Sequence, residues 1–470
     1  MSKLVLFLPE LFFLLLIVVL FIRILMRPNR DEALAWLPWA AFVGVLVALG
    51  SIGVKGDLFW SAYQVDSLSQ FFKAAIAVGF FVAVLNALGT TTVDAEKRKD
   101  YFLFLTISAW GLMLLSSAVE LVTMYVALEV SSYSLFALVP LRSNSREAAE
   151  AGVKYILFAA AATAVSLYGL SYIIATQHST YLSDLAAGTG ILGGGVLGAV
   201  GLVMFLSGFF YKLALFPFHF WTPDVYQGAS NETTTFIATL PKLGAVVVLI
   251  RLATLFAPGM VPADVMAWLA ALSMTYGNLA ALIQKDVKRL LGYSGVAHAG
   301  YIILGIIAGT AAGLASAAFY ALAYLFMNLT CFWVICRLSP KGENVLVEDL
   351  NGLARRFPLM AFALAVGAFA LVGLPPTAGF MGKLFLFTSI WGQGYNWLVI
   401  VAALNSAVSI YYYLNLVRHA YTQEPGTKTV AIPKAGTLWA GVLAVCVLLL
   451  GIIPGPVYEW ALQAGHALIP

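Results

Sequence analysis

Long apolar runs without a charged residue recur along the whole chain, and they constrain its fold more than any other feature. The segment 435–454 is one example. A helix needs about 20 such residues to cross ~30 Å of hydrocarbon. The 470 residues are 61% hydrophobic and only 10% charged, whereas soluble domains carry roughly 25% charged residues. The sequence therefore predicts an all-α polytopic membrane protein. It excludes a soluble domain, and it lacks the short alternating segments of a membrane β-barrel.

Fourteen spans are predicted from the apolar runs. The first, 4–26, is too long for the apolar core of a signal peptide and is followed by no small-residue cleavage site. The twelfth, 357–391, is too long for one straight helix and is interrupted by Gly373-Leu374-Pro375-Pro376 and by Gly379. It is therefore predicted to be one broken span. The full set is 4–26, 36–54, 68–90, 101–117, 119–139, 151–175, 194–216, 232–256, 262–284, 289–310, 313–337, 357–391, 396–421 and 435–454.

A weak internal repeat predicts how these spans are organised. Ala151-Gly152-Val153-Lys154 resembles Ala312-Gly313-Leu314-Ala315, and the interrupted spans that hold Lys212 and Lys383 also lie five spans apart. An odd offset reverses the direction of a span in the membrane, which gives the inverted repeat of many ion transporters. The predicted units are a three-helix segment (1–100), a first five-helix repeat (101–260, spans 4–8), a second inverted repeat (261–421, spans 9–13) and a C-terminal span (422–470).

Basic residues are unequally divided between the two sides of the membrane. Lys3 and Lys55 are the basic loop residues on the side of the N-terminus. Cytoplasmic loops are enriched in Lys and Arg, so both termini are predicted to face away from the cytoplasm. The loops on the other side hold seventeen: Arg27, Arg30, Lys97, Arg98, Lys99, Arg142, Arg146, Lys285, Lys288, Arg289, Arg337, Lys341, Arg355, Arg356, Arg418, Lys428 and Lys434.

Seven further basic residues fall within or at the ends of spans. Arg23, Lys73, Lys154 and Arg251 lie near span ends, where long side chains reach the interface. Lys212, Lys242 and Lys383 differ, because apolar residues flank each of them. A charge at membrane depth is costly and points to function. Each of the three is also next to a predicted helix break, and the breaking residues are Pro217, Pro241, Pro375, Pro376 and Gly379.

Glu129 is the carboxylate expected to face these lysines, because it stands alone in the apolar run 124–133. Burial and pairing shift a lysine pKa in opposite directions. A Glu–Lys pair that can be broken therefore suits a proton relay, although a static pair that fixes helix packing is the alternative for Glu129 and Lys212. His219 and His298 also lie near membrane depth. For His298, a proton-carrying role and a packing role are equally compatible with the sequence.

No redox centre or metal site is predicted in this chain, and no cofactor. Its three cysteines, Cys331, Cys336 and Cys446, lie in apolar stretches at spacings unsuited to an iron–sulfur cluster or structural zinc. Neither a phosphate-binding loop nor a dinucleotide fingerprint is present. The net charge of +4 does not indicate nucleic-acid binding. The expected task is transport driven by energy from elsewhere.

Several motifs identify a known family. They are Leu8-Pro9-Glu10, Ala127-Leu128-Glu129, the stretch 211–229 with Trp221-Thr222-Pro223-Asp224-Val225-Tyr226, the stretch 288–294, Leu374-Pro375-Pro376-Thr377-Ala378-Gly379-Phe380-Met381-Gly382-Lys383, and the stretch 405–413. The chain resembles the subunit N family of bacterial NADH:quinone oxidoreductase (respiratory complex I), one of its antiporter-like membrane subunits. The resemblance spans nearly all of the predicted helices.

The resemblance implies roles for individual residues. Glu129 and Lys212 match the family's ion pair, and Lys154 matches a lysine beside it. Lys242 matches the lysine that bridges two half-channels, Lys383 the one at the outlet, and His219 and His298 fall on the central polar axis.

The same resemblance implies a setting. FMN, iron–sulfur clusters and quinone are expected in partner subunits. The expected partners are other membrane-arm subunits, including homologous antiporter-like and small membrane subunits, with the lipid bilayer of the bacterial inner membrane around them. Both termini are expected in the periplasm.

Three alternatives remain at this stage. The chain could serve a cation/proton antiporter or a membrane-bound hydrogenase-type complex, or it could be a scaffold whose buried charges fix packing, while a substrate carrier fits least well. Separately, the segment from Val345 to Arg356 is expected to form an amphipathic interfacial helix or to dock a partner.

Overall fold

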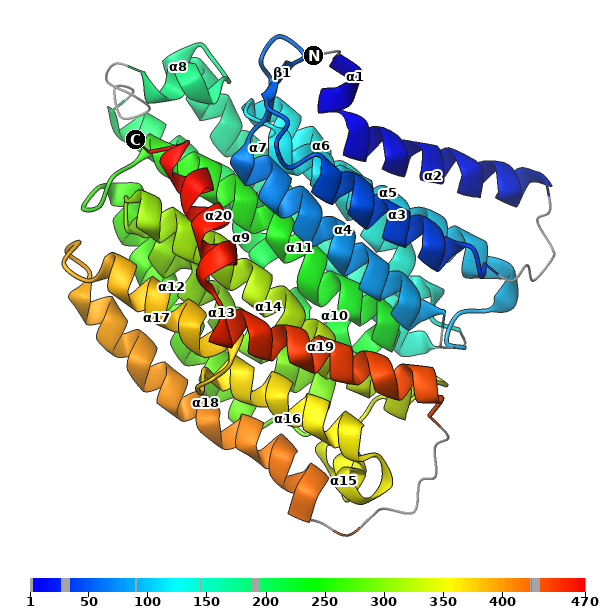
Figure 1. The fold of residues 1–470 in the computed structure, drawn as a ribbon. Helices are drawn as coiled ribbons and strands as arrows, with labels where there is room; N and C mark the ends of the chain where they lie inside the picture. Colours follow the sequence, from blue (N-terminus) through cyan, green and yellow to red (C-terminus); the bar gives the residue numbers. More distant parts are fainter. Residues whose placement is uncertain are drawn as a thin grey trace.

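The computed structural model of this chain describes residues 3–26, 34–88, 91–143, 145–187, 195–422, 424 and 432–469. Arg27, Arg30 and Lys428, which contribute to the predicted charge asymmetry, lie outside the described residues. The described part is one bundle of long helices with a single short hairpin, and both termini lie at the same end of it (Figure 1). The prediction of an all-α membrane protein is confirmed.

Twelve helices of the described part are long and apolar enough to cross a membrane. They are α2 (Leu8–Met26), α4 (Ser67–Ala87), α5 (Arg98–Ser117), α6 (Leu121–Leu138), α7 (Arg146–Gln177), α9 (Gly195–Leu213), α11 (Asn231–Leu252), α12 (Val261–Leu282), α13 (Val287–Ile307), α14 (Ala311–Leu338), α18 (Asn396–Thr422) and α19 (Lys434–Ile452).

The other elements are shorter. The apolar ones are α3 (Leu37–Gly50), α16 (Pro358–Val372) and α17 (Ala378–Ile390). The rest are α1 (Lys3–Leu6), α8 (Leu182–Ala186), α10 (Trp221–Gly228), α15 (Leu353–Arg356), α20 (Gly455–His466), the 3₁₀ turns η1 (Ala95–Lys97), η2 (Val139–Leu141), η4 (Ala253–Leu255) and η5 (Val347–Leu350), and the antiparallel strands β1 (Gly56–Leu58) and β2 (Tyr63–Val65).

Each of the fourteen predicted spans contains one or more of these helices, but two of them are not single long helices. The span 36–54 holds α3, whose 14 residues reach only ~21 Å at 1.5 Å per residue. The span 357–391 holds α16 and α17. The short helix α20, which packs against α14 and α4, was not predicted.

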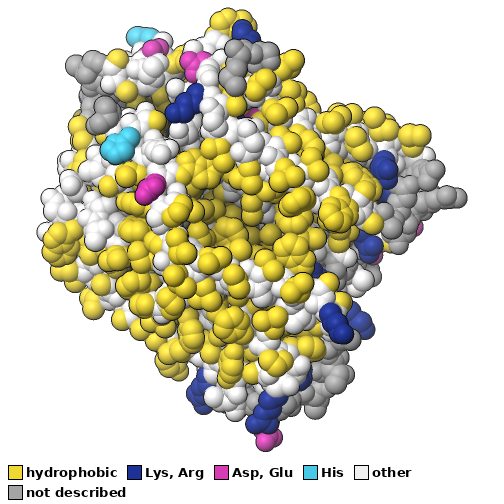
Figure 2. Space-filling model, viewed as in Figure 1, with side chains coloured by type: hydrophobic (Ala, Val, Ile, Leu, Met, Phe, Trp, Pro, Cys, Tyr) yellow, Lys and Arg dark blue, Asp and Glu magenta, His cyan; other side chains and the backbone are white. Residues whose placement is uncertain are grey.

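Burial divides the helices into an inner and an outer set. The most apolar window of α11 is 100% buried inside the protein, and those of α13 and α14 are 94% and 89% buried. By contrast, α2 is 28% buried, and its outer face is apolar. Figure 2 shows the resulting broad hydrophobic surface, with most visible Lys and Arg along its lower and right-hand rim. Polar side chains on α11, α13 and α14 are therefore shielded from lipid by other helices.

Prolines interrupt two helices of the bundle but not a third. Pro217 lies between α9 and α10, and Pro375 and Pro376 lie between α16 and α17. The predicted break at Pro241 is wrong, because α11 continues through it. A proline inside a helix removes one hydrogen bond and costs about 3 kcal/mol. Every residue of α11 is buried, and packing on all sides holds the helix together in spite of that loss.

Gly379 does not break a helix either. It lies in the first turn of α17, where a Cβ would overlap the carbonyl oxygen of Ala370. The glycine therefore permits the close approach of α17 to the end of α16. The segment from Val345 to Arg356 is also not one amphipathic helix. It forms η5 and α15, separated by Gly352 in the left-handed conformation (φ 66°), and His419 Nδ1 of α18 lies 2.6 Å from Asn351 Oδ1.

Candidate functional site

The three lysines predicted at membrane depth are all buried, each no more than 5% exposed. Lys212 lies in the last turn of α9, Lys242 in the middle of α11 and Lys383 in the second turn of α17. An ammonium group in such a place needs polar partners or must lose its proton. The partners differ from one lysine to the next, and they define three parts of the site.

The first part surrounds Lys212 and Glu129. Among the described side chains, Lys212 Nζ donates one hydrogen bond, to the Tyr155 hydroxyl at 3.5 Å. Three aromatic rings stand 5.4–5.7 Å from it. The half-buried Glu129 of α6 instead accepts a hydrogen bond from the Thr163 hydroxyl at 2.9 Å. Tyr155 and Thr163 are both on α7. No direct ion pair joins Glu129 to Lys212, two residues well inside the described part.

Lys154 has partners of its own. Its ammonium binds Glu150, one turn earlier on α7, at 2.8 Å and Asp224 of α10 at 2.7 Å. Asp224 also binds Arg289 of α13 at 2.8 Å. Glu150, Lys154 and Asp224 line a hollow of about 160 Å³ at the surface. These carboxylates satisfy the charge of Lys154, and no hydrogen bond or ion pair joins it to Glu129 or Lys212, all three being described residues.

His219 lies in the break between α9 and α10. It is 1% exposed, and its ring contacts Phe220 and Tyr276 at centroid distances of 4.6 and 4.7 Å. Its Nδ1 is buried without a hydrogen-bond partner among the described residues. Buried polar atoms normally bind protein or ordered water. His219 is thus placed to hold a water at the break that follows Lys212.

The second part lies at the centre of the bundle. Lys242 Nζ donates to the Gly295 carbonyl at 3.0 Å and to the Tyr324 hydroxyl at 3.1 Å. The ring of Tyr324 is 5.2 Å from that of His298. His298 in turn shares hydrogen bonds with the Tyr320 hydroxyl at Nδ1 (2.7 Å) and the Tyr413 hydroxyl at Nε2 (3.3 Å). One ring nitrogen of a neutral imidazole donates and the other accepts, so His298 can pass a proton between two hydroxyls.

The third part surrounds Lys383. Its ammonium donates to the Val372 carbonyl at 2.8 Å, to the Leu371 carbonyl at 3.4 Å and to the Ser406 hydroxyl at 3.1 Å. Ser406 also donates to the Tyr301 hydroxyl at 3.0 Å. The ring of Tyr301 is 5.8 Å from that of His298. Groups with exchangeable protons thus lie between Lys242 and Lys383. The hydrogen bonds among them form three separate sets, at Lys242, His298 and Lys383, and ring contacts join the sets.

Sequence reasoning missed the hydroxyl groups that connect the lysines. These are Tyr155, Thr163, Tyr301, Tyr320, Tyr324, Ser406 and Tyr413. The i, i+4 spacing of Tyr320 and Tyr324, which puts both on one helical face, is the one signal that was available. In the sequence, a tyrosine that only packs within an apolar span cannot be distinguished from one whose hydroxyl carries a proton.

The interpretation of Lys73 and Arg251 as surface-reaching side chains was wrong. Lys73 is fully buried and binds Glu10 at 2.7 Å. Arg251 is 1% exposed and binds both carboxylate oxygens of Asp66, at 2.9 and 3.0 Å. Both lie near span ends in the sequence, but neighbouring segments cover those ends. No cluster of three His, Cys, Asp or Glu arranged to hold a metal ion occurs in the ranges that the structure describes.

Comparison with known proteins places this geometry in a family context. Residues 118–409 match the family model described as NADH:quinone oxidoreductase/Mrp antiporter, TM. The chain is 57% identical to NADH-quinone oxidoreductase subunit N 2 of Solidesulfovibrio magneticus, over 98% of this chain and 99% of that protein.

Two solved structures extend the comparison. A chain of respiratory complex I from Thermus thermophilus with bound aureothin is 32% identical, with a TM-score of 0.84, over 96% of this chain and 98% of that one. A chain of the Mrp complex from Dietzia is 19% identical, with a TM-score of 0.90, over 99% and 98%. The second likeness concerns the fold alone.

Proposed function

Because the chain belongs to the NADH:quinone oxidoreductase/Mrp antiporter transmembrane family, we propose that it is a proton-translocating membrane subunit of an NADH:quinone oxidoreductase. One observation supports this most: buried lysines on α9, α11 and α17 are each bonded to hydroxyls or carbonyls, and histidine and tyrosine side chains fill the space between two of them. The energy comes from electron transfer in other subunits.

The proposed cycle begins at Glu129 and Lys212. When the Glu129 carboxylate approaches Lys212, its charge favours the protonated amine. When the carboxylate turns to Thr163, as in this structure, the ammonium keeps one long hydrogen bond and gives up its proton more readily. Moving one charge across 100 mV requires ~2.3 kcal/mol, which corresponds to fewer than two pKa units at about 1.4 kcal/mol each.

The proton released by Lys212 passes toward Lys242, by way of water held at the break near His219. From Lys242 it reaches Tyr324 and the hydroxyls around His298. Tyr301 and Ser406 then connect this centre to Lys383, which releases the proton to the outlet. Lys154 takes no direct part, since Glu150 and Asp224 hold it at the surface hollow.

The proposed setting follows from the relatives. The partners are homologous antiporter-like subunits and small subunits of the same membrane arm, and FMN, iron–sulfur clusters and quinone belong to partner subunits. The surrounding lipid is the bacterial inner membrane. Both termini, which share one end of the bundle (Figure 1), face the periplasm.

The test is proton pumping by the complex that contains this chain, measured per NADH oxidised in membrane vesicles. Lys212→Ala and Glu129→Ala are expected to lower this ratio, because each removes one member of the pair that gates release. The exposed Lys55→Ala serves as the matched control and should leave the ratio unchanged.

Undiminished pumping by both variants would contradict the proposal and favour a packing scaffold. Mild solubilisation gives a second readout. Recovery of the chain with homologous membrane chains and no redox subunit would instead indicate a cation/proton antiporter.

A further inference from the structure

A Glu–Lys ion pair is buried in the N-terminal part of the molecule, on helices other than those that carry Lys212, Lys242 and Lys383. Glu10 of α2 and Lys73 of α4 are 2.7 Å apart, and both side chains are 0% exposed. The Tyr63 hydroxyl of β2 donates to the same Glu10 oxygen at 2.6 Å, and the ring of Tyr63 is 5.2 Å from the Lys73 ammonium. The hairpin thus covers the pair from the end of the bundle that carries the termini.

Stability alone gives a weak reason for such a pair. Removing two charges from water is expensive, and well-packed apolar residues at the same positions are often as stable or more so. A buried Glu–Lys pair is also the arrangement that the proposed relay uses at Glu129 and Lys212. A proton-carrying role for Glu10 and Lys73 requires that the pair can exchange protons with water.

Four polar atoms beside the pair lack partners among the described residues. They are Oε2 of Glu10, both polar atoms of Gln70 and the hydroxyl of Ser117. Gln70 is 0% exposed and precedes Lys73 by three residues, so the two share one face of α4. The Ser117 hydroxyl lies near that of Tyr63. Buried polar atoms that protein does not satisfy normally bind ordered water, and these four atoms offer such water donors and acceptors beside the pair.

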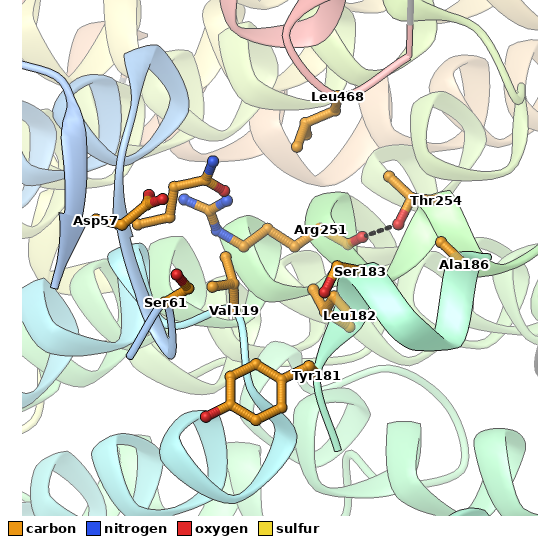
Figure 3. A pocket seen from close by; sticks show the side chains of 11 residues that line it. Asp57, Ser61, Val119, Tyr181, Leu182, Ser183, Ala186, Arg251, Thr254 and Leu468 are labelled. Atoms are coloured by element: carbon orange, nitrogen blue, oxygen red, sulfur yellow. Dashed lines mark hydrogen bonds between the residues drawn. The ribbon is translucent and has the colours of Figure 1, made fainter. Parts of the chain in front are cut away.

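An open hollow lies next to this cluster. Its volume is about 450 Å³, and Asp57, Gln64, Arg251 and the C-terminal Leu468 are among its lining residues. Figure 3 shows the Arg251 side chain extending along it toward Asp57. The same guanidinium donates to the Ser116 carbonyl at 2.9 Å and to Asp66. Gln64 lines the hollow and Ser116 bonds Arg251, and their neighbours in the sequence, Tyr63 and Ser117, lie beside the pair. The hollow and the Glu10–Lys73 pair are therefore close together.

We propose that Glu10 and Lys73 form a proton-exchange site that communicates, through Tyr63, Ser117 and the waters they bind, with the aqueous hollow beside Arg251. The site is distinct from the outlet assigned to Lys383 and opens on the face that carries both termini. This inference rests on the proposed function of the chain as a proton translocator.

The proton count is simple. In the ion pair, Lys73 is an ammonium and Glu10 a carboxylate. Uptake of one proton from water converts Glu10 to a carboxylic acid, and its release to water restores the carboxylate. Burial and the Glu10 charge raise the pKa of Tyr63 well above its usual value. Tyr63 therefore keeps its own proton and acts as a hydrogen-bond donor that holds Glu10 in place.

The experiment compares three variants of the whole complex in proteoliposomes, with pumped protons measured per NADH oxidised. Lys212→Ala defines the share of pumping that this subunit contributes. The double variant Glu10→Leu/Lys73→Met removes both charges while keeping an apolar core, and Tyr63→Phe removes one hydroxyl while keeping the ring. We expect both to lower the ratio, with assembly of the complex unchanged.

Two results would overturn the inference in different ways. If Lys212→Ala lowers the ratio but Tyr63→Phe and the double variant do not, the pair is structural and the proposed function stands. If Lys212→Ala leaves the ratio unchanged, the proposed function fails and this inference fails with it. Should the double variant not assemble, Tyr63→Phe decides the question, because an unchanged ratio in that variant also rejects an exchange site.

Discussion

The two broken helices place their lysines in opposite ways. Lys212 precedes its break, and the carbonyl of Tyr211 beside it accepts a hydrogen bond from the Trp221 indole at 3.0 Å. Lys383 follows its break, and its ammonium itself binds the last carbonyls of α16, Leu371 and Val372. At the first break, the Tyr211 carbonyl accepts from the neutral Trp221 indole and from the Ala214 backbone N–H, whereas at the second break the last carbonyls of α16 accept from the lysine.

The two lysines therefore differ in how firmly their partners hold them. The C-terminal end of a helix carries partial negative charge that favours a cation, and both lysines lie at such an end, Lys212 in the last turn of α9 and Lys383 against the end of α16. Of the two, Lys383 bonds the helix-end carbonyls directly, so rigid backbone anchors it. Lys212 depends on one long hydrogen bond and on whatever charge Glu129 brings near. A proton-releasing group that must respond to a moving partner belongs at the first position. A group that stays fixed and releases the proton, as proposed for Lys383, belongs at the second position.

Replacement of Lys383 is expected to change the protein most, because it should lower both proton pumping and stability. Lys383→Met should remove the proton-pumping share of the subunit and also destabilise it, because each buried carbonyl left without a partner costs roughly 1–3 kcal/mol. Lys212→Met should remove the same share of pumping with little loss of stability. Pumping and thermal unfolding of the complex measure the two effects. Equal destabilisation by both variants would contradict the comparison.

Trp221→Phe is expected to have a smaller effect, because it should let Lys212 bind a helix-end carbonyl, as Lys383 does at the second break. Trp221→Phe removes the indole donor from the Tyr211 carbonyl, which keeps the Ala214 backbone N–H as a donor and gains one free lone pair for the Lys212 ammonium. A charge-assisted hydrogen bond of about 1.5–3 kcal/mol would then hold the proton, and pumping should slow several-fold without being abolished. The rate of proton pumping under saturating NADH tests this. A rate equal to that of the parent complex would show that the indole does not control Lys212.

The smallest expected effect concerns one partner of Lys383. Ser406→Ala removes one hydroxyl of the anchor and leaves both carbonyls, a loss of about 1 kcal/mol. Pumping should fall by less than in Trp221→Phe, with stability nearly unchanged. The matched control is Ser389→Ala, because that serine on α17 bonds only its own helix among the described residues. A complete loss of pumping in Ser406→Ala would contradict this ranking, because it would mean that water cannot replace the hydroxyl between Tyr301 and Lys383.

The sequence predicted the burial of three lysines but not that of Lys73 and Lys288, and it did not predict what surrounds them. Lys212, Lys242 and Lys383 stood out because charge is rare in apolar spans. Their partners could not be predicted, since the contacts of Tyr324 and Ser406 depend on how each helix is rotated against its neighbours. The Glu150–Lys154 contact was available as an i, i+4 pair. The burial of Lys73 was not predicted, because its partner Glu10 lies in the first span and a hairpin covers it. The spacing of apolar residues within one span indicates neither contact.

The complete burial of α11 has a consequence for how the chain is made in the cell. Each span enters the bilayer before the finished bundle exists to surround it, and a lysine near the centre of a lone helix then opposes insertion by about 2.5–3.5 kcal/mol. The run Val246–Ile250 offsets that penalty during synthesis, although it never touches lipid afterwards. The mean hydropathy of 1.9 in α11 therefore serves biogenesis, while Lys242 serves the mature subunit.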